Sequence, residues 1–317
     1  MNQTAKLFAR TAIAATVLSL GSSAFAAAFD ANIELDNTYR SGNAVAETDK
    51  GLGQGGRVEM NASGKAGADM FVAGRASFLA KKDGTVATDD MWIQVGSTGG
   101  DVKLGRFEAA DLFPLAQDTL VNHAGNVYGT NTLRGRKDGS QFHAAGTLNL
   151  SAGLSLELGV VENKTTAKGV RPVLSYVAGP VTARLGFEAG KYAPVGGASA
   201  NDVRGVGATV GYDFGGFKVT GNIASGKTDA ATHNNMNSVG VTFATGGLVV
   251  GLISAKTEEA AGGDLKVQTA YASYSMPLFD IKGATWTPAL SSSTAKNSTT
   301  GTDVKENSFR IRLNYAF

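Results

Sequence analysis

Strict alternation of apolar and polar residues marks both ends of the chain. In SFRIRLNYAF, residues 308–317, the odd positions from Phe309 to Phe317 are apolar or aromatic, and Arg310 and Arg312 lie between them. The segment FDANIELDNTY, residues 29–39, alternates in the same way. Because successive side chains of a β-strand point to opposite faces, each segment predicts a strand with one apolar face and one face that accepts charge.

The same period recurs along most of the chain and predicts about sixteen strands. They are expected at residues 29–40, 55–66, 70–81, 91–97, 102–107, 132–148, 154–162, 170–178, 181–190, 203–214, 216–226, 237–245, 248–257, 265–276, 281–290 and 304–317. Tight connections, such as 98–101 and 178–180, alternate with longer polar ones, such as 191–202 and 227–236. This asymmetry is typical of a transmembrane β-barrel, and a soluble sandwich has no need of it.

Two physical requirements favour closure of these strands into a barrel. In hydrocarbon every backbone N–H and C=O must be paired within the protein, so the first strand must pair with the last. About sixteen strands leave an aqueous channel, whereas about eight are filled by their own side chains. We therefore expect an all-β fold, a transmembrane antiparallel β-barrel. The odd residues 309–315 should face lipid, and Arg310 and Arg312 should face the lumen.

The N-terminal residues have the pattern of an export signal. Lys6 and Arg10 precede an apolar stretch at residues 11–20, which is followed by the small-residue pattern Ala24-Phe25-Ala26. The apolar run is shorter than the ~20 residues that a membrane-spanning helix needs. The sequence thus predicts a signal peptide at residues 1–26, cleavage after Ala26, and a barrel domain at residues 27–317.

Composition excludes several classes of site. The chain contains no cysteine, which excludes disulfides and thiolate zinc sites, and its three histidines are far apart, so neither a metal nor a cofactor is expected. Lys6 and Arg10 account for the excess of 29 basic over 27 acidic residues, so the part after the signal is balanced in charge. Such a balance gives no basic footprint for nucleic acid.

Three features together resemble Gram-negative outer-membrane porins of the general-diffusion or carbohydrate type. They are the export signal, the final strand that ends in Phe317, and DVKLGRFEAADLFP at residues 101–114. The resemblance implies a homotrimer in the outer membrane, in contact with outer-membrane lipid and lipopolysaccharide. It also implies passive transport of small hydrophilic solutes, among them ions or sugars, without enzymatic activity. In this family the barrel-assembly machinery reads the final strand, here Tyr315 and Phe317, and the third external loop folds into the pore.

Residues 107–131 form the longest stretch without alternation. A connection of that length in a compact protein is usually functional or disordered, and its apolar content argues against disorder. We expect it to be the inward-folded third external loop, with Glu108, Asp111 and Asp118 as acidic groups of a pore constriction. The alternative is an external loop that packs on a neighbouring subunit or covers the mouth of the barrel.

Rings of fixed charge determine which solutes a pore admits, so basic residues are expected on the wall facing this loop. The candidates are Arg134 and Arg136, two apart in the strand expected at 132–148, with Arg57 and Arg75 on early strands. Sugar-selective porins stack sugar rings on aromatic side chains, and the candidate aromatic lining residues are Trp92, Phe113 and Tyr128.

A second function class also uses a barrel: an outer-membrane hydrolase with catalytic residues in external loops. Asp89 and Asp90, in a loop expected at 82–90, together with His233 could supply such a site. A hydrolase needs a base, a nucleophile or activated water, and an orienting group within hydrogen-bond reach. No recurring serine or acid motif in the sequence supports this arrangement, so the passive channel is favoured.

Overall fold

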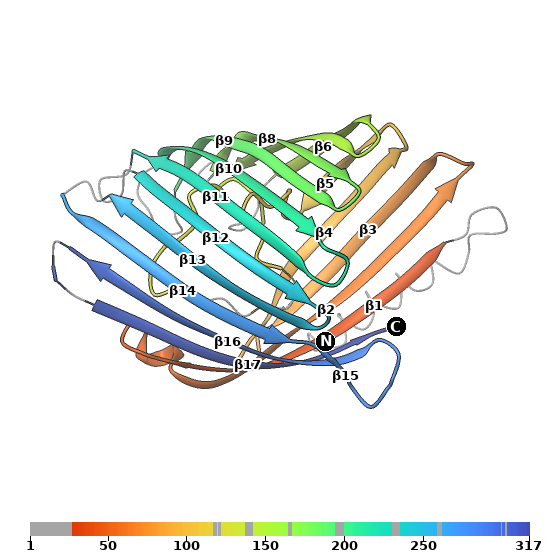
Figure 1. Ribbon diagram of the computed structural model, residues 1–317. Helices are drawn as coiled ribbons and strands as arrows, with labels where there is room; N and C mark the ends of the chain where they lie inside the picture. Colours follow the sequence, from red (N-terminus) through yellow and green to blue (C-terminus); the bar gives the residue numbers. More distant parts are fainter. Residues whose placement is uncertain are drawn as a thin grey trace, which may run out of the picture.

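The structure is a computed structural model that describes residues 27–116, 119, 122–136, 142–163, 167–193, 200–229, 235–258, 262–298, 300–301 and 303–317. These residues form a closed antiparallel barrel of tilted strands (Figure 1). No helix within the described ranges is long and apolar enough to cross a membrane. The signal peptide expected at residues 1–26 lies outside the described residues.

One sheet of seventeen strands makes up the barrel, and β15 contributes only two residues, so sixteen strands form the wall. The strands are β1 (Ala28–Ser41), β2 (Gly51–Ala66), β3 (Met70–Ala80), β4 (Val86–Ser97), β5 (Gly100–Arg106), β6 (Phe142–Ser151), β7 (Leu154–Asn163), β8 (Ala167–Ala178), β9 (Val181–Tyr192), β10 (Asn201–Asp213), β11 (Lys218–Thr228), β12 (Asn235–Thr245), β13 (Leu248–Glu258), β14 (Asp264–Tyr274), β15 (Met276–Pro277), β16 (Ala284–Asn297) and β17 (Asp303–Ala316). A short 3-10 helix, η1 (Glu47–Asp49), lies between β1 and β2.

The first and last strands close the barrel, as the pairing requirement predicts. β1 pairs with β17 in a register that places Ile33 opposite Tyr315 and Tyr39 opposite Phe309. Beyond the end of β17, the backbone N–H of Phe317 donates to the carbonyl of Ala31 at 2.9 Å, and the N–H of Ala31 donates back at 2.8 Å. β1 pairs with β2 on its other side, so neither terminal strand is left with a free edge.

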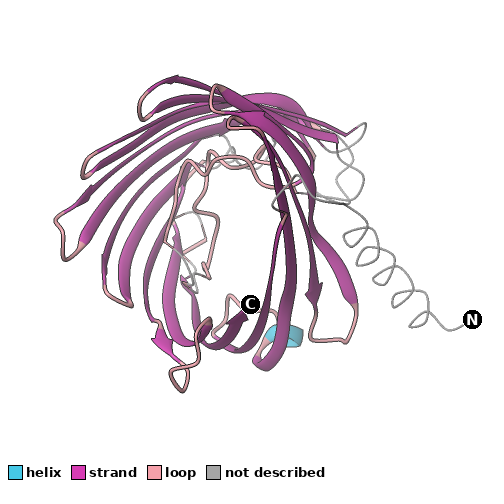
Figure 2. Cartoon of the chain, turned by 90° about the vertical axis from the view of Figure 1, so that its right-hand side faces the viewer, coloured by secondary structure: helices cyan, strands magenta, loops and turns pink. Residues whose placement is uncertain are grey.

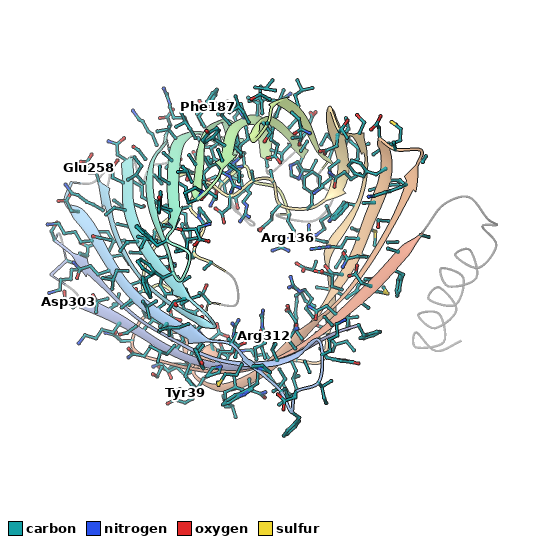
Figure 3. All side chains as sticks on the ribbon, turned by 45° about the vertical axis from the view of Figure 1, so that its right-hand side comes forward. Tyr39, Arg136, Phe187, Glu258, Asp303 and Arg312 are labelled. Atoms are coloured by element: carbon teal, nitrogen blue, oxygen red, sulfur yellow. The ribbon has the colours of Figure 1, made fainter. Side chains whose placement is uncertain are left out.

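The two faces of the final strand are also as predicted. Phe309, Leu313 and Tyr315 are on the outside of the barrel and exposed, whereas Arg310 is buried on the inside at 7% exposure. Figure 3 shows Arg312 projecting into the ring of strands, while Tyr39 and Phe187 project away from it. The apolar face meets hydrocarbon, and the polar face meets the lumen.

The three largest differences from the predicted strand boundaries each have a local reason. β4 begins at Val86 and not at 91, because a bulge places both Asp89 and Asp90 opposite Ser77 and so interrupts the period of two. β16 continues to Asn297, through small hydroxyl residues without apolar contrast. β6 begins only at Phe142, so residues 132–136 belong to the preceding loop.

Candidate functional site

The segment between β5 and β6, residues 107–141, is called the inner loop here. Figure 2 shows its described part inside the ring of strands, along one side of the wall. Its contacts include residues on the inner face of strands from β7 to β17, so it runs across the strands and not along them. Asp118, one of the predicted acidic groups, lies outside the described residues.

Wall side chains bind the outgoing half of the inner loop by its backbone carbonyls. Arg171 on β8 donates to the carbonyl of Ala110, and Asn222 on β11 donates to the carbonyl of Pro114 at 2.9 Å. The side-chain amide of Asn122 then reaches Ser308 Oγ on β17 at 2.8 Å. The loop therefore crosses the wall as far as the strand that closes the barrel.

The returning half is held by hydroxyl and carboxylate groups. The N–H of Ala124 donates to Ser293 Oγ on β16 at 2.9 Å, and Ser238 on β12 donates to the carbonyl of Val127. At the end of this path, the backbone N–H groups of residues 132 and 133 each donate to Glu188 on β9 at 2.9 Å. Backbone polar groups of the loop thus have partners inside the barrel, as burial requires.

Inward-facing glycines allow the loop to approach the wall this closely. A Cβ on Gly226 or on Gly205 would overlap the backbone carbonyl oxygen of Gly129. On Gly240 a Cβ would lie 2.9 Å from the ring of Phe113. The glycines at these wall positions leave the space that the inner loop occupies, because a larger residue would fill it. We call this part of the wall, at Gly205, Gly226 and Gly240, the seat of the inner loop.

Apolar residues of the loop form a core with the inner wall. Phe113 and Val127 of the loop are each 1% exposed, and they cluster with wall residues that include Ile253, Val267 and Tyr271. Burial of this apolar surface stabilises the seated loop. Phe113 therefore cannot line the pore, and its prediction as an aromatic lining residue was wrong: its ring packs in this core.

The rings of the other two aromatic candidates, Tyr128 and Trp92, are in contact with other side chains of the protein. Tyr128 packs edge-on against Phe113, with ring centroids 5.7 Å apart, and its hydroxyl bonds to His123 Nε2 at 2.9 Å. Trp92 is on the inner face of β4, where Lys103 Nζ lies 4.4 Å from its ring centroid and the guanidinium of Arg75 lies 5.7 Å away. Cations held over an aromatic face compete with a stacking sugar.

His123 is a titratable residue held inside the barrel at the far end of the inner loop. Its ring bonds to Tyr128 and, through Nδ1, to Thr269 Oγ1 on β14 at 2.9 Å, and burial lowers the pKa of His123 from 6.5 to about 4. The same burial raises the pKa of Tyr128. At neutral pH the seated imidazole is therefore uncharged.

We expect acid to loosen this end of the loop. His123 binds a proton near pH 6.5 when the loop is displaced and only near pH 4 when the loop is packed against the wall. The free energy that favours the packed loop therefore falls by roughly 1.4 kcal/mol for each pH unit as the pH decreases from 6.5 to 4. Channel current noise should rise between pH 6.5 and 4 in planar bilayers. A His123→Gln channel, which keeps hydrogen-bonding capacity but does not titrate, should lack that rise; an equal rise in both would contradict the assignment.

A ladder of ion pairs occupies the wall that the inner loop leaves uncovered. Arg312 on β17 contacts Asp36 at 2.8 Å and Glu34 at 3.4 Å, both on β1. Arg57 on β2 continues the ladder, 2.8 Å from Glu34 and 3.5 Å from Asp89 on β4. Strands β17, β1, β2 and β4 are thus linked across the lumen face by alternating charges.

Arg136 carries the ladder from the wall onto the inner loop. Its guanidinium lies 2.8 Å from Asp89 and 3.4 Å from Glu108. Arg134 then pairs with Glu108 at 3.1 Å and with Asp111 at 3.2 Å. Figure 3 shows Arg136 inside the ring of strands.

The positions of Arg134 and Arg136 correct their prediction as wall residues. Both precede β6 and belong to the inner loop, so Glu108 and Asp111 do not face them across the pore but bind them directly. The alternation in TLRGRKDG has the period of a strand, but Arg136 has a left-handed φ of 56°, which ordinary strand residues do not adopt. Arg57 and Arg75 do lie on early strands, as predicted.

Burial divides the two signs of charge in the part of the ladder between β1 and β4, where Arg136 of the inner loop joins the wall. At the β17 end the charges are not divided in this way, since the side chain of Arg312 is 14% exposed and that of Asp36 is 24% exposed. The carboxylate residues are 5 to 8% exposed: Glu34, Glu59, Asp89 and Asp90. The side chains of the arginines are 26 to 32% exposed: Arg57, Arg75 and Arg136. The carboxylates lie beneath the guanidinium groups, so the surface that meets lumen water here is mainly cationic. Glu34, Asp36 and Glu59 were not among the site residues predicted from sequence, although the parity of segment 29–39 could have identified the first two. Asp89 and Asp90 were considered only for the hydrolase alternative.

A buried pair anchors the base of the inner loop. Arg171 on β8 and Glu188 on β9 lie 3.4 Å apart, and each side chain is 1% exposed. Besides Glu188, Arg171 binds the side-chain carbonyl of Asn131 at 2.8 Å. We refer to Arg171 and Glu188 as the clamp; neither was recognised from sequence, because each has the ordinary pattern of a polar strand residue.

The hydrolase candidates do not form a site among the described residues. Asp89 and Asp90 were expected in an external loop, and this was wrong: they lie within β4, while the loop before that strand covers only residues 81–85. Both carboxylates are ion-paired with arginines in the ladder. His233 lies outside the described residues.

Comparison with known proteins gives one family match and several structural matches. Residues 23–145 match the family model described as "Porin-like glycoporin RafY". No curated protein matches the chain significantly.

The similar solved structures share its barrel fold at low sequence identity. OmpT of Vibrio cholerae in its trimer form is 13% identical, with a TM-score of 0.66, and the match covers 93% of this chain and 100% of that one. The anion-selective porin from Comamonas acidovorans is 16% identical, with a TM-score of 0.65 and the same coverage. A mutant of the Rh. blastica porin is 14% identical, with a TM-score of 0.58, covering 92% and 100%.

Proposed function

We propose that this chain, an outer-membrane porin, forms a water-filled channel through which small hydrophilic solutes diffuse passively, without catalysis. The observation that carries the proposal is the division of the inner wall. The inner loop covers the wall from β8 to β17, and the ion-pair ladder lines the wall from β17 through β1 to β4. Solutes pass between the loop and the ladder, where fixed charges act at close range.

The constriction consists of Glu108 and Asp111 with Arg57, Arg75, Arg134 and Arg136. Because the wall carboxylates are buried beneath arginines, the constriction favours anions over cations. The similar porin from Comamonas acidovorans is anion-selective, which supports this preference. Asp118 stays a candidate from sequence alone.

Sugars are further candidate solutes, since an uncharged polyol can hydrogen-bond to a charged wall without ionic discrimination. The description of the matching family model as a glycoporin supports them. The aromatic candidates do not, because Phe113 is buried and the face of Trp92 is shared with cations.

Assembly is proposed to be trimeric, in keeping with the trimer form of the similar OmpT structure. Insertion is proposed to depend on the barrel-assembly machinery reading Tyr315 and Phe317. Both side chains are exposed at the C-terminal end of the closing strand, with stacked rings whose centroids are 5.4 Å apart.

The test is the reversal potential of single channels in a planar bilayer under a salt gradient. Arg75→Gln leaves Glu59, 3.1 Å away, without this cation. A unit charge at about 4 Å in water is worth about 1 kcal/mol, so the anion-to-cation permeability ratio should fall by up to about fivefold.

Arg204→Gln is the matched control for Arg75→Gln. Arg204 is exposed on β10 and lies on the same face of the strand as the outward-facing Val206 and Val210. Its replacement therefore removes one positive charge, as Arg75→Gln does, but outside the lumen. Selectivity should not change in this variant. If both variants leave it unchanged, the ladder does not line the conducting path; if the wild-type protein conducts no ions, the channel proposal fails.

A further inference from the structure

A polar cavity lies inside the barrel, between the inner loop and the tight turns that join strands from β8 to β13. Its volume is about 320 Å³, and Pro114 and Ala116 of the inner loop line one side of it. The wall residues that line it lie near the turns at 178–180, 214–217 and 246–247, on the periplasmic side of such a barrel. We call this cavity the periplasmic pocket. No residue assigned to the constriction lines it.

Strand register brings basic and hydroxyl side chains together at the periplasmic pocket. Its polar lining includes two cations and four hydroxyl groups: Arg184, Lys218, Ser175, Thr182, Thr209 and Thr220. In the row below Arg184, toward the periplasm, Thr182 on β9 and Thr220 on β11 lie on either side of Gly211 on β10.

Gly211 lies between these side chains and shows that they converge. The position that its Cβ would take is 2.6 Å from Thr182 Oγ1, 3.0 Å from Lys218 Cε and 3.2 Å from Thr220 Oγ1. Two hydroxyl groups and the end of a lysine side chain therefore meet over one glycine. They form a compact set of hydrogen-bond donors on the wall of the lumen.

The arginine of the pocket binds only uncharged acceptors. Arg184 donates to the backbone carbonyl of Asp111 at 2.6 Å and to Ser175 Oγ at 3.4 Å. Among the described residues, no carboxylate lies within ion-pair distance of its guanidinium, whereas Arg57 and Arg75 of the ladder each pair with a carboxylate. A guanidinium has five N–H donors, so Arg184 keeps donors for a solute.

The lysine of the pocket also lacks a carboxylate partner within the described ranges. Asp213 is opposite Lys218 in the register, but its carboxylate accepts a backbone N–H of the turn at 2.8 Å and is not within ion-pair distance of the lysine. The hydroxyl of Thr220 has no hydrogen-bond partner in the same part of the chain. The pocket therefore presents two uncompensated positive charges and a free hydroxyl group to the lumen.

We propose that the periplasmic pocket binds a small phosphorylated sugar. Its phosphate lies at Lys218, with the hydroxyl groups of Thr182 and Thr220 as further donors, and its sugar extends toward Arg184. Uncompensated cations favour an anionic group, and hydroxyl side chains both donate and accept, as sugar hydroxyls require. The volume of about 320 Å³ is at the lower end of small-molecule sites, which span roughly 300–1,000 Å³. The inference rests on the proposed function, because the solute reaches the pocket through the channel.

The experiment measures equilibrium dialysis of radiolabelled probes against the folded, purified full-length protein in detergent. The probes are glucose 6-phosphate, glucose and inorganic phosphate. The wild-type protein should bind glucose 6-phosphate roughly tenfold more tightly than either of the others, because only this probe contacts both parts of the pocket. Lys218→Gln should weaken its binding by roughly fivefold, as expected for one unit charge at about 4 Å in water. Ala244→Phe should abolish binding by filling the pocket that Ala244 lines.

Lys65→Gln is the matched control for Lys218→Gln. Lys65 is on the same face of β2 as the inward-facing Arg57, near the tight turn at 67–69, and it does not line the pocket. Its replacement removes the same charge at the same end of the lumen, so glucose 6-phosphate should bind as to the wild type. Heat-modifiable electrophoretic mobility should show which variants fold, and Thr220→Val, which should weaken binding severalfold, replaces Lys218→Gln if that variant does not fold.

Equal binding of glucose 6-phosphate by Lys65→Gln and the folded pocket variants would overturn the proposal. Binding of inorganic phosphate as tight as that of glucose 6-phosphate would also overturn it, because no sugar contact would then contribute. A wild-type channel that conducts ions in a planar bilayer but does not bind glucose 6-phosphate would contradict this inference alone. A wild-type protein that conducts no ions would contradict the proposed function, and this inference with it.

Discussion

Replacement of Glu188 by alanine is expected to release the inner loop from its base. Arg171 would then keep a guanidinium that is 1% exposed and has lost its carboxylate partner, and the N–H groups of Thr132 and Leu133 would lose their acceptor. Removal of one partner of a buried ion pair costs about 3–5 kcal/mol. The barrel wall should not need this pair, because β8 and β9 are paired on both sides of it, up to Val170 opposite Ala189 and again from Val173 opposite Gly186.

The readout for the clamp is single-channel conductance together with limited proteolysis of the folded protein. Glu188→Ala should give a larger conductance, more current noise and new cleavage within residues 107–136. Glu188→Gln, which keeps one carbonyl acceptor, should lie between it and the wild type.

Glu162→Ala is the control for this change, since Glu162 is 57% exposed and lies 3.7 Å from Lys168. An exposed pair contributes about 0–1 kcal/mol, so its channel should resemble the wild type. A Glu188→Ala protein with wild-type conductance and protease resistance would show that the clamp does not hold the loop.

Replacement of Gly226 by valine is expected to displace the loop at its returning half. The added Cβ would occupy the position of the Gly129 backbone, and neither backbone can yield without moving the loop or the strand. Overpacking of this kind costs about 1–3 kcal/mol, which shifts the ratio of displaced to seated loop by roughly 5- to 150-fold. Conductance and the size limit for neutral polymers should both rise.

The control for this second change is on the same strand. Gly221 is exposed on β11, and no atom lies within 4 Å of the position that its Cβ would take. Gly221→Val should therefore assemble and conduct as the wild type does. If Gly226→Val assembles and also conducts as the wild type, the loop does not limit the passage; failure of Gly226→Val alone to assemble would indicate that the seat is needed for folding.

The strand-by-strand organisation of the wall could be predicted from the sequence, because a period of two in polarity has a direct physical cause. A strand between hydrocarbon and water must alternate, and residues 308–317 do so without exception up to Tyr315. Closure between β1 and β17 followed from the need to pair every backbone group in hydrocarbon. Both inferences depend on local pattern and on the solvent alone.

The arrangement inside the lumen depended on tertiary contacts that the pattern does not encode. The bulge that buries Asp89 and Asp90 hides the period at the start of β4, and Arg134 and Arg136 alternate like strand residues although they lie in the inner loop. Phe113 could not be assigned to a lining or to a core until its wall neighbours were known.

Register decided the remaining features. The sequence shows Arg184, Gly211 and Lys218 as separate residues, and only the pairing of β9, β10 and β11 brings them together at one pocket. The same is true of Gly205 and Gly226, whose missing side chains matter because the loop backbone crosses them. The sequence by itself determined which face of each strand is wet, since that depends on the residue and its neighbours along the chain. The tertiary structure decided which wet or dry residues meet, since that depends on the stagger of strands and on the path of a loop far away in sequence.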